Sequence, residues 1–445
     1  MQLSCPKGHY SLTGCEQCTG RSGRLPTHGV LRKAFSPRLI RKMLTYEQAR
    51  CTVIEQVAID KGPRATTNLP VLSALGHVLA QEVKSDREYP PFDRSTRDGY
   101  AVRASDVAAG ATLRCTGEIK AGDTVTAPLT PNTCVQIMTG AALPSGADAV
   151  VMIEHTQRDA DMVRFDRAAQ PGQNVVPHGC EAKAGQTLLR SGMRLGYAEL
   201  AIAAQVGARE LRCASKPRVA VLSTGNEVIS IDAAPGPFQI RNSNSVSLAA
   251  QVKLAEGEPV LLGNAADDVE DLRQKIALGL NEDVLVLSGG VSMGKYDLVE
   301  TVLKELGAAF YFDAVSIRPG KPAVFGRCRD TFVFGLPGNP ISTMVTFELL
   351  VVPALDLLSG AHARPLPLLE AKLSQALNEK PGLTHFLPAR LEWHGAAPQV
   401  KPLPWQGSGD IATLARANCF LVVPSARSQV AAGESVAVLL RKDVV

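Results

Sequence analysis

Cysteine is scarce in this chain, with 10 such residues among 445. That density is too low for a fold held together by disulfide bonds. Most of the cysteines stand singly in apolar or strand-like segments, as Cys134, Cys213 and Cys419 do. We therefore expect reduced thiols and a cytoplasmic protein.

Long apolar runs are also missing. The best candidate, LLVVPALDLL at 349–358, contains Pro353 and Asp356 and is typical of a buried helix. The N-terminus lacks the apolar central stretch of a secretory signal. These absences predict a protein that has no membrane partner.

The body of the chain has no excess of basic residues. Residues 1–42 hold eight basic residues and one acidic residue, a net charge of +7, so the total of +4 leaves −3 for residues 43–445. A mildly acidic body argues against a nucleic-acid partner.

The basic segment 1–42 contains a pattern with zinc-capable ligand types. The pattern C-x3-H-x5-C-x2-C is formed by Cys5, His9, Cys15 and Cys18. The alternatives are a disordered basic extension, a targeting peptide, or a natural start further along at Met43. The sequence leaves these alternatives open.

Several common catalytic motifs are absent. Neither a Walker A motif nor a G-x-G-x-x-G fingerprint occurs, which disfavours an ordinary NTPase or dehydrogenase. The histidines are scattered, so no Ser-His-Asp arrangement is indicated.

Strands and helices alternate from residue 216 onwards. Buried strands are predicted at 218–224 and 283–288, and helices at 244–257 and 267–280, with Asn242 or Ser243 capping the first helix. Such alternation predicts a doubly wound α/β domain with a parallel sheet covered on both faces. We assign residues 216–360 to it.

Two other regions are rich in short strands. Residues 86–178 contain apolar runs broken by Gly and Pro, which indicate a β-rich insert domain. Residues 365–440 hold alternating strands and turns, which predict a small C-terminal β domain.

Four loops of the α/β domain follow predicted strands: STGNE (223–227), SGGVSMGKYD (288–297), RPGKP (318–322) and GLPGNPIS (335–342). Ligands of a doubly wound sheet bind beyond the carboxyl ends of its strands. Glycine lets the backbone approach a ligand, and exposed N–H groups favour an anion such as phosphate. The residues predicted to form this phosphate cradle are Ser288, Gly289, Gly290, Ser292, Gly294, Pro337, Gly338 and Asn339.

Charged residues in the same loops complete the predicted site. Arg318 and Lys321 supply positive charge for an anion. Glu227 and Asp297 are carboxylates, and two carboxylates near a phosphate usually hold Mg²⁺. Capping of the following helix is the alternative role of Asp297.

Six segments together resemble one known family. These four loops, PPFDRSTRDGYAVRASD (90–106) and IMTGAALPSGADAVV (137–151) are similar to the signatures of the MoeA/gephyrin E-domain family, the molybdopterin molybdenumtransferases. The likeness runs in order over about residues 43–440 and leaves 1–42 outside.

The resemblance implies a reaction and an architecture. The reaction is the insertion of molybdate into adenylylated molybdopterin, with release of AMP and a requirement for Mg²⁺. The fold would add to the α/β domain an elongated N-terminal linker domain (43–85 and 179–215), the β-rich insert and a C-terminal β-barrel. The family forms homodimers whose active site is shared between the α/β domain of one chain and the β-rich insert of the other.

The resemblance also implies functional positions. The catalytic positions that match are Asp98, Thr139, Glu181, Glu227 and Asp297. The matching substrate-binding positions are Arg318, Lys321, Ser342 and Ser408. Arg390 is expected to replace a family arginine that faces molybdate, because it lies two residues beyond Pro388 on the same face of a strand.

Four residues depart from the family pattern. Arg94 stands where Asn is usual, Arg97 where an apolar residue is usual, Asn226 where Asp is common, and Arg318 where Lys is common. The changes at 94 and 318 keep or add positive charge, so anion binding is expected to survive. The change at 226 weakens metal binding only if an Asp there is a ligand.

Two other functions stay open beside the transferase. The chain could be an inactive or scaffolding relative that binds molybdopterin, or the molybdopterin adenylyltransferase that acts one step earlier. If the chain is the transferase, that adenylyltransferase and downstream cofactor carriers are its expected protein partners. The sequence does not separate molybdate from tungstate, because the two anions share shape and charge.

Overall fold

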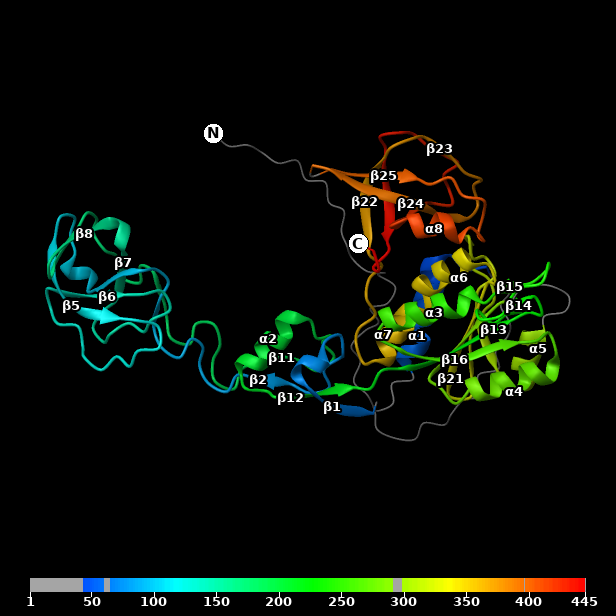
Figure 1. The fold of residues 1–445 in the computed structure, drawn as a ribbon, viewed down its shortest axis with the longest axis horizontal. Coiled ribbons are helices and arrows are strands. Elements are labelled where there is room, and N and C mark those ends of the chain that lie inside the picture. Colours follow the sequence, from blue (N-terminus) through cyan, green and yellow to red (C-terminus); the bar gives the residue numbers. More distant parts are fainter. Residues whose placement is uncertain (1–42, 60–64, 291–297, 396, 445) are drawn as a thin grey trace, which may run out of the picture. The chain divides into compact units, whose positions relative to one another are not determined.

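The computed structural model describes residues 43–59, 65–290, 298–395 and 397–444 (Figure 1). The predicted zinc ligands Cys5, His9, Cys15 and Cys18 lie outside these residues, as do Ser292, Gly294 and Asp297.

A six-stranded sheet forms the centre of the α/β domain, in the order β16-β13-β17-β21-β20-β18. Its first four strands are parallel, whereas β20 and β18 run antiparallel to their neighbours. This confirms the doubly wound prediction and adds an antiparallel edge. The bounds are β13 (Arg218–Thr224), β16 (Glu258–Ala265), β17 (Val284–Ser288), β18 (Ala309–Phe312), β20 (Val324–Cys328) and β21 (Thr331–Leu336).

Helices cover both faces of this sheet. Leu248 of α3 and Ile341 of α6 belong to one core cluster, while Leu272 of α4 and Val302 of α5 belong to the other. A fully buried side chain such as Leu287 contributes roughly 1.5–3 kcal/mol by leaving water. The bounds are α3 (Ser243–Leu254), α4 (Val269–Gly279), α5 (Leu298–Glu305), α6 (Pro340–Thr346), the π-helical turn η5 (Phe347–Val351) and α7 (Val352–Leu358).

Side-chain caps fix where two of these helices begin. Asn242 accepts a hydrogen bond from the backbone N–H of Ser245, as predicted for α3. Asp268 accepts from the N–H groups of Glu270 and Asp271 at the start of α4. Each cap satisfies backbone donors that a helix leaves without an internal partner.

The continuous helical stretch Pro340–Leu358 is long and apolar enough to cross a membrane, and it is 89% buried inside the protein. No other helix of the described residues meets that test. Its burial matches the prediction of a core helix. Helix α1 (Tyr46–Ile59) packs against it through Ala49, Val53 and Val57, so these residues join the core of the α/β domain. The predicted linker boundary at 43–85 stays a prediction.

Two chain segments that flank the insert pair with each other. Strand β1 (Thr66–Pro70) pairs with β12 (Glu210–Ala214), and β2 (Val83–Lys84) pairs with β11 (Thr187–Leu189). The turn η2 (Val71–Ala74) and helix α2 (Tyr197–Gln205) complete their core.

The insert has its own six-stranded sheet, in the order β7-β4-β6-β5-β9-β8. Tyr100 and Phe165 meet edge to face in its core, with ring centroids 6.2 Å apart. The bounds are β3 (Arg94–Ser95), β4 (Gly99–Val102), η3 (Ala104–Asp106), β5 (Thr112–Ile119), β6 (Thr133–Ile137), β7 (Ala149–Met152), η4 (Ile153–His155), β8 (Thr156–Asp159), β9 (Met162–Phe165) and β10 (Val175–Val176).

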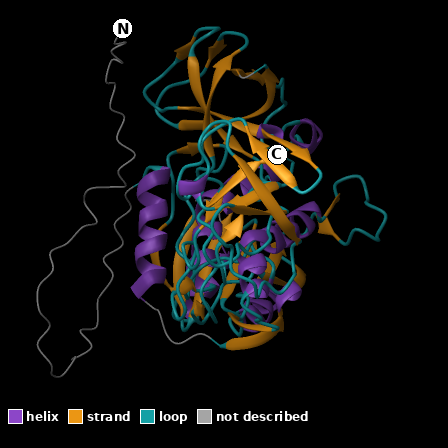
Figure 2. Ribbon diagram, turned by 90° about the vertical axis from the view of Figure 1, so that its left-hand side faces the viewer, coloured by secondary structure: helices purple, strands orange, loops and turns teal. Residues whose placement is uncertain are grey.

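The C-terminal strands close into a barrel. They follow the order β24-β25-β22-β28-β26, and β26 pairs with β24 again. These strands stand out in orange at the top of Figure 2. The short strand β19 (Ile317–Arg318) leaves the α/β domain and pairs with β24. The remaining bounds are β14 (Val228–Ile229), β15 (Ile240–Arg241), β22 (Leu368–Leu373), β23 (Leu377–Asn378), β24 (Thr384–His394), β25 (Ala397–Pro402), α8 (Ile411–Arg416), β26 (Cys419–Val423), β27 (Gln429–Val430) and β28 (Ser435–Leu440).

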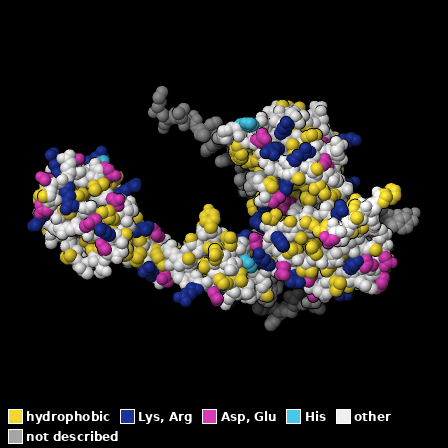
Figure 3. Space-filling view, viewed as in Figure 1, with side chains coloured by type: hydrophobic (Ala, Val, Ile, Leu, Met, Phe, Trp, Pro, Cys, Tyr) yellow, Lys and Arg dark blue, Asp and Glu magenta, His cyan; other side chains and the backbone are white. Residues whose placement is uncertain are grey.

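Acidic and basic side chains are interspersed over the face of the described residues drawn in Figure 3. This mixture agrees with the near balance of charge in residues 43–445.

Candidate functional site

A cavity of about 860 Å³ lies at the carboxyl ends of the parallel strands. The loops after β13, β16, β17 and β21 form its walls, because the carboxyl ends of parallel strands share one edge of the sheet. Two of the predicted loops, 223–227 and 335–342, and the described part of a third therefore meet here. The predicted residues that line it are Glu227, Ser288, Gly289, Gly290, Pro337, Gly338 and Asn339.

The glycines of the loop after β17 are required by geometry. Gly289 and Gly290 have φ angles of +93° and +62°, in the left-handed region that favours glycine. A Cβ at Gly290 would lie 2.7 Å from Cγ2 of Val299 and 2.8 Å from Oγ1 of Thr224. A side chain at this position would therefore require its neighbours to move.

Asn244, in the first turn of α3, joins two of these loops. Its Nδ2 donates to Oγ of Ser288 at 2.8 Å and to the carbonyl oxygen of Gly338 at 2.7 Å. Its Oδ1 is buried and has no hydrogen-bond partner among the described residues. Sequence reasoning missed Asn244, although its place two residues after the helix cap at a sheet edge could have indicated it.

Two carboxylates line the same cavity, Glu227 after β13 and Asp267 after β16. Asp267 is fixed by Asn226: the Asp267 N–H donates to Oδ1 of Asn226 at 3.0 Å, and the Asn226 N–H donates to Asp267 Oδ2 at 3.4 Å. Sequence reasoning treated 267 only as the start of a helix. Asn226, which stands where the family commonly has Asp, therefore lies next to an acidic residue, Asp267.

The donor set of this cavity fits Mg²⁺. That ion is usually held by one or two carboxylates together with phosphate oxygens of the substrate. Glu227 and Asp267 supply such carboxylates. No group of three or more His, Cys, Asp or Glu suited to a metal occurs among the described residues.

A second cavity of about 330 Å³ adjoins the first and shares Pro322, Pro337 and Asn339 with it. Its polar lining includes the four predicted anion-binding residues Arg318, Lys321, Ser342 and Ser408. The structure thus brings together residues from the α/β domain and from the C-terminal domain, since β19 carries Arg318 alongside the barrel.

Arg318 has an acidic neighbour behind it. Its Nη1 lies 3.6 Å from Oε2 of Glu379, and the same oxygen lies 2.9 Å from Nδ1 of His385. His385 is buried, and its Nε2 lies 2.9 Å from the carbonyl oxygen of Lys380. Arg318 is half exposed, so this contact orients its guanidinium without burying the charge.

Arg390 does not line either cavity. It lies exposed on β24, and its Nε is 3.1 Å from Oε1 of Glu392. The two residues before it, Pro388 and Ala389, are buried. Arg390 thus lies outside both cavities, and its predicted role at the anion site stays a prediction.

The predicted residues of the insert, and Glu181 of the linker domain, form pairs of their own. Oδ1 of Asp98 accepts hydrogen bonds from the N–H of Thr139 at 2.7 Å and from its Oγ1 at 2.9 Å. These two bonds lower the pKa of Asp98 below its ordinary value. Glu181 lies 2.6 Å from Nη2 of Arg94, another departure from the family pattern. None of these four residues lines either cavity.

The architecture defines a multidomain protein built around a molybdopterin-binding type of α/β domain. Residues 44–207 match the family model for the MoeA N-terminal region (domain I and II), 220–357 the model described as "Probable molybdopterin binding domain", and 370–440 the MoeA C-terminal region (domain IV).

Similar proteins agree over nearly the whole chain. The molybdopterin molybdenumtransferase of Haemophilus influenzae is 32% identical over 401 residues, which cover 89% of this chain and 98% of that protein. That of Nostoc sp. is 34% identical, over 82% of this chain and 87% of its own length. A crystal structure of the molybdopterin biosynthesis MoeA protein from Pyrococcus horikoshii matches with a TM-score of 0.69 and 33% identity, over 90% of this chain and 99% of its own.

The chain belongs to the molybdopterin molybdenumtransferase family. The predicted family, multidomain α/β fold and transferase class are thereby confirmed.

Proposed function

We propose that this chain transfers molybdenum, supplied as molybdate, into adenylylated molybdopterin and releases AMP. The proposal rests on two adjoining cavities that differ in charge. The charged residues of the larger are Glu227, Asp267 and Arg241, and those of the smaller are Arg318 and Lys321. The first suits a metal-bound pyrophosphate, and the second suits a dianion.

The larger cavity would hold the nucleotide-linked substrate. The glycine loop after β17 lines this cavity, and backbone N–H groups of such a loop suit phosphate oxygens. Two donors there are already used within the protein: the N–H of Gly289 donates to the carbonyl oxygen of Leu336, and Nδ2 of Asn244 donates to Ser288 and Gly338. Glu227 and Asp267 would hold Mg²⁺, with Asp297 as a further predicted ligand. The chemistry that Mg²⁺ supplies when bound is neutralisation of charge on the pyrophosphate.

The smaller cavity would hold molybdate. Arg318 and Lys321 provide positive charge, and the hydroxyls of Ser342 and Ser408 can donate hydrogen bonds to its oxygens. Among the described residues, no side chain is placed as a nucleophile in either cavity. A water molecule would therefore attack the adenylyl phosphorus, the P–O bond of the pyrophosphate would break, and AMP would leave from the phosphate of molybdopterin. The two dithiolene sulfurs would bind molybdenum, and one molybdate oxygen would leave as water with the two thiol protons.

The site would be completed in a homodimer. Asp98, Thr139 and Glu181 are family functional positions, yet they line neither cavity of their own chain. We propose that a second copy presents them, Asp98 and Thr139 from its insert and Glu181 from its linker domain, which an isologous dimer would do twice. Cytoplasmic location and contacts with the adenylyltransferase and downstream carriers remain parts of this proposal.

The decisive experiment supplies two substrate pairs to the full-length protein. AMP release from adenylylated molybdopterin on addition of molybdate supports the proposal. Pyrophosphate release from molybdopterin and ATP would instead indicate the adenylyltransferase. Binding of molybdopterin with neither product would indicate a scaffolding relative. Tungstate in place of molybdate would then establish the anion preference.

A further inference from the structure

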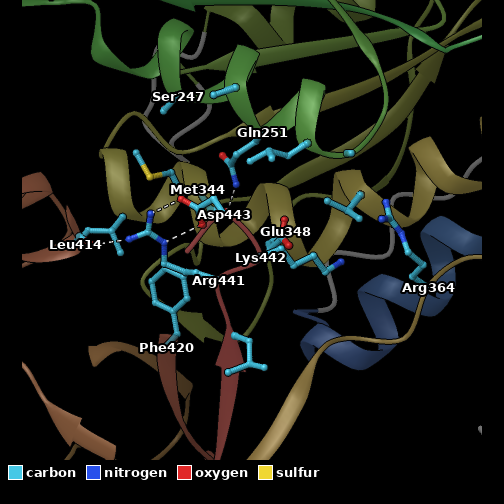
Figure 4. A pocket seen from close by; sticks show the side chains of 15 residues that line it. Ser247, Gln251, Met344, Glu348, Arg364, Leu414, Phe420, Arg441, Lys442 and Asp443 are labelled. Atoms are coloured by element: carbon cyan, nitrogen blue, oxygen red, sulfur yellow. Dashed lines mark hydrogen bonds and ion pairs between the residues drawn. The ribbon is translucent and has the colours of Figure 1, made fainter. Parts of the chain in front are cut away.

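A third cavity, of about 210 Å³, lies apart from the candidate site (Figure 4). It shares no lining residue with the two cavities described above. Helix α3, the helical stretch 340–358 and the end of the chain form it. Leu254, Val352, Phe420 and Leu440 make its wall largely apolar.

The charged residues that line this cavity are Glu348, Arg364, Arg441, Lys442 and Asp443. Two of the basic residues form ion pairs with an acidic residue. Arg364 is paired with the fully buried Asp356, and Arg441 with Asp443. By contrast, the side chains of Glu348 and Lys442 make no hydrogen bond and no close ion pair with any residue that the structure describes. Their charges act on each other and on Arg364 at longer range. The cavity therefore presents one carboxyl group and one ammonium group without a direct partner.

Burial disfavours the charged forms of both Glu348 and Lys442. Burial raises the pKa of Glu348 and lowers the pKa of Lys442, although each acts on the other in the opposite sense. A ligand that carries opposite charges at the two positions would reduce this cost.

Gln251 adds a third unsatisfied group. Its Nε2 donates to the carbonyl oxygen of Met344 at 3.1 Å, which fixes the orientation of the amide. Its Oε1 is buried and has no hydrogen-bond partner among the described residues. A buried acceptor without a donor is costly, so this atom favours a ligand that donates.

The backbone that presents Glu348 is itself unusual. Glu348 lies in the π-helical turn Phe347–Val351, between α6 and α7. Such turns insert an extra residue into a helix and occur frequently at functional sites. Met344, Glu348 and Val352 all line the cavity from this stretch.

We infer that this cavity binds a small zwitterion of the α-amino-acid type with an apolar side chain. The ammonium group would meet Glu348 and Oε1 of Gln251, and the carboxylate would meet Lys442. The side chain would pack on Leu254 and Phe420. Since an apolar cavity of about 150 Å³ holds benzene, this one has room for about eight to ten non-hydrogen atoms, the size of leucine.

Calorimetric titration of the full-length protein tests the inference with three probes. L-Leucine carries both charges, 4-methylpentanoate lacks the ammonium group, and 3-methylbutylamine lacks the carboxylate. We expect L-leucine to bind with a Kd of about 1 mM or below, and each analogue to bind at least about tenfold more weakly.

Variants locate the binding. Glu348→Gln should weaken L-leucine binding by about tenfold or more, because a charged hydrogen bond is lost. Ala250→Phe places a ring at the exposed edge of the cavity and should block binding without altering the core. Glu282→Gln is the matched control, because Glu282 is also largely buried but lies outside the cavity.

Thermal unfolding of each variant shows whether it remains folded. Three results would overturn the inference: no heat with L-leucine at concentrations on the order of tens of millimolar, equal binding of L-leucine and either analogue, or unchanged binding in the folded Ala250→Phe variant. Loss of binding in Glu282→Gln alone would place the site elsewhere.

Discussion

Asp98 of the insert and Glu227 of the α/β domain are held in different ways. In the insert, Asp98 accepts two hydrogen bonds from Thr139 within its own domain. In the α/β domain, the carboxylate of Glu227 accepts no hydrogen bond from any described residue, and it faces the large cavity.

This difference indicates different roles. Asp98 is oriented and kept ionised before any ligand arrives, since Thr139 lowers its pKa. Glu227 keeps its lone pairs available for a ligand, which is what binding of a cation requires. The comparison predicts that the α/β carboxylates act on the metal and the substrate, whereas Asp98 acts as a fixed anion from the insert.

The largest expected effect follows from removing the α/β carboxylates. Glu227→Ala and Asp267→Ala should each reduce AMP release by about 100-fold or more, because the charge of the pyrophosphate would lose its metal. The same loss is expected for Asp297→Ala. Glu258→Gln, an exposed change on β16, is the control and should retain activity. Full turnover in folded Glu227→Ala and Asp267→Ala enzymes would remove the metal assignment.

The next effect tests whether the two regions meet across a dimer. Asp98→Ala and Glu227→Ala should each be nearly inactive alone. Mixed dimers would carry one site with both defects and one intact site, so random subunit exchange should restore about a quarter of the wild-type rate. Proven exchange without recovered AMP release would show that one chain supplies both residues.

A smaller effect is expected from the hydroxyl that orients Asp98. Thr139→Val removes the 2.9 Å bond from Oγ1 and keeps the backbone N–H bond. The pKa of Asp98 should rise toward its ordinary value, so the carboxylate would become protonated at a higher pH as the solution is acidified. The acid limb of the pH–rate profile should therefore move upward, with a loss of less than about tenfold at pH 7.

Thr133→Val is the matched control, because its hydroxyl contacts the nearby Thr130 rather than a carboxylate: it donates to the carbonyl oxygen at 2.7 Å and lies 3.2 Å from Oγ1. If the pH–rate profiles of Thr139→Val and wild type are identical, turnover does not depend on the ionisation of Asp98.

A weaker effect concerns the acidic residue behind Arg318. Glu379→Gln removes a negative charge that competes with an anion for the guanidinium 3.6 Å away. We expect KM for molybdate to fall by about two- to fivefold, since contacts of half-exposed charges are weak. Glu392→Gln makes the same change beside Arg390, outside both cavities, and should leave KM unchanged. A higher KM in Glu379→Gln would show that Glu379 helps more by orienting Arg318 than it hinders by repelling the anion.

The smallest effect is expected from removal of residues 1–42. Every motif of the transferase lies after Met43, so a chain that starts there should retain turnover. Metal analysis of the full-length protein tests the zinc hypothesis separately, and stoichiometric zinc that disappears on truncation would support it. A large loss of AMP release in the shortened chain would assign a catalytic role to the extension.

The sequence alone determined the architecture and most of the anion site. Alternation of apolar strands and amphipathic helices defined the doubly wound domain, because each pattern has its own period. Glycine at 289 and 290 indicated a close backbone approach, and the structure places both residues in a conformation that requires glycine. Arg318, Lys321 and Ser342, which lie in two of the predicted loops, line one cavity together with Ser408, which the family resemblance added.

The tertiary structure decided which side chains turn toward those cavities. Asn244 and Asp267 belong to helix starts in the sequence, and only the common edge of the parallel strands brings them to Glu227 and the glycine loop. Arg390 follows the local rule of strand alternation, yet it is exposed on β24 beside Glu392 and lines neither cavity. Local patterns fix the period of an element, whereas the packing of its neighbours fixes which of its residues reach a shared space.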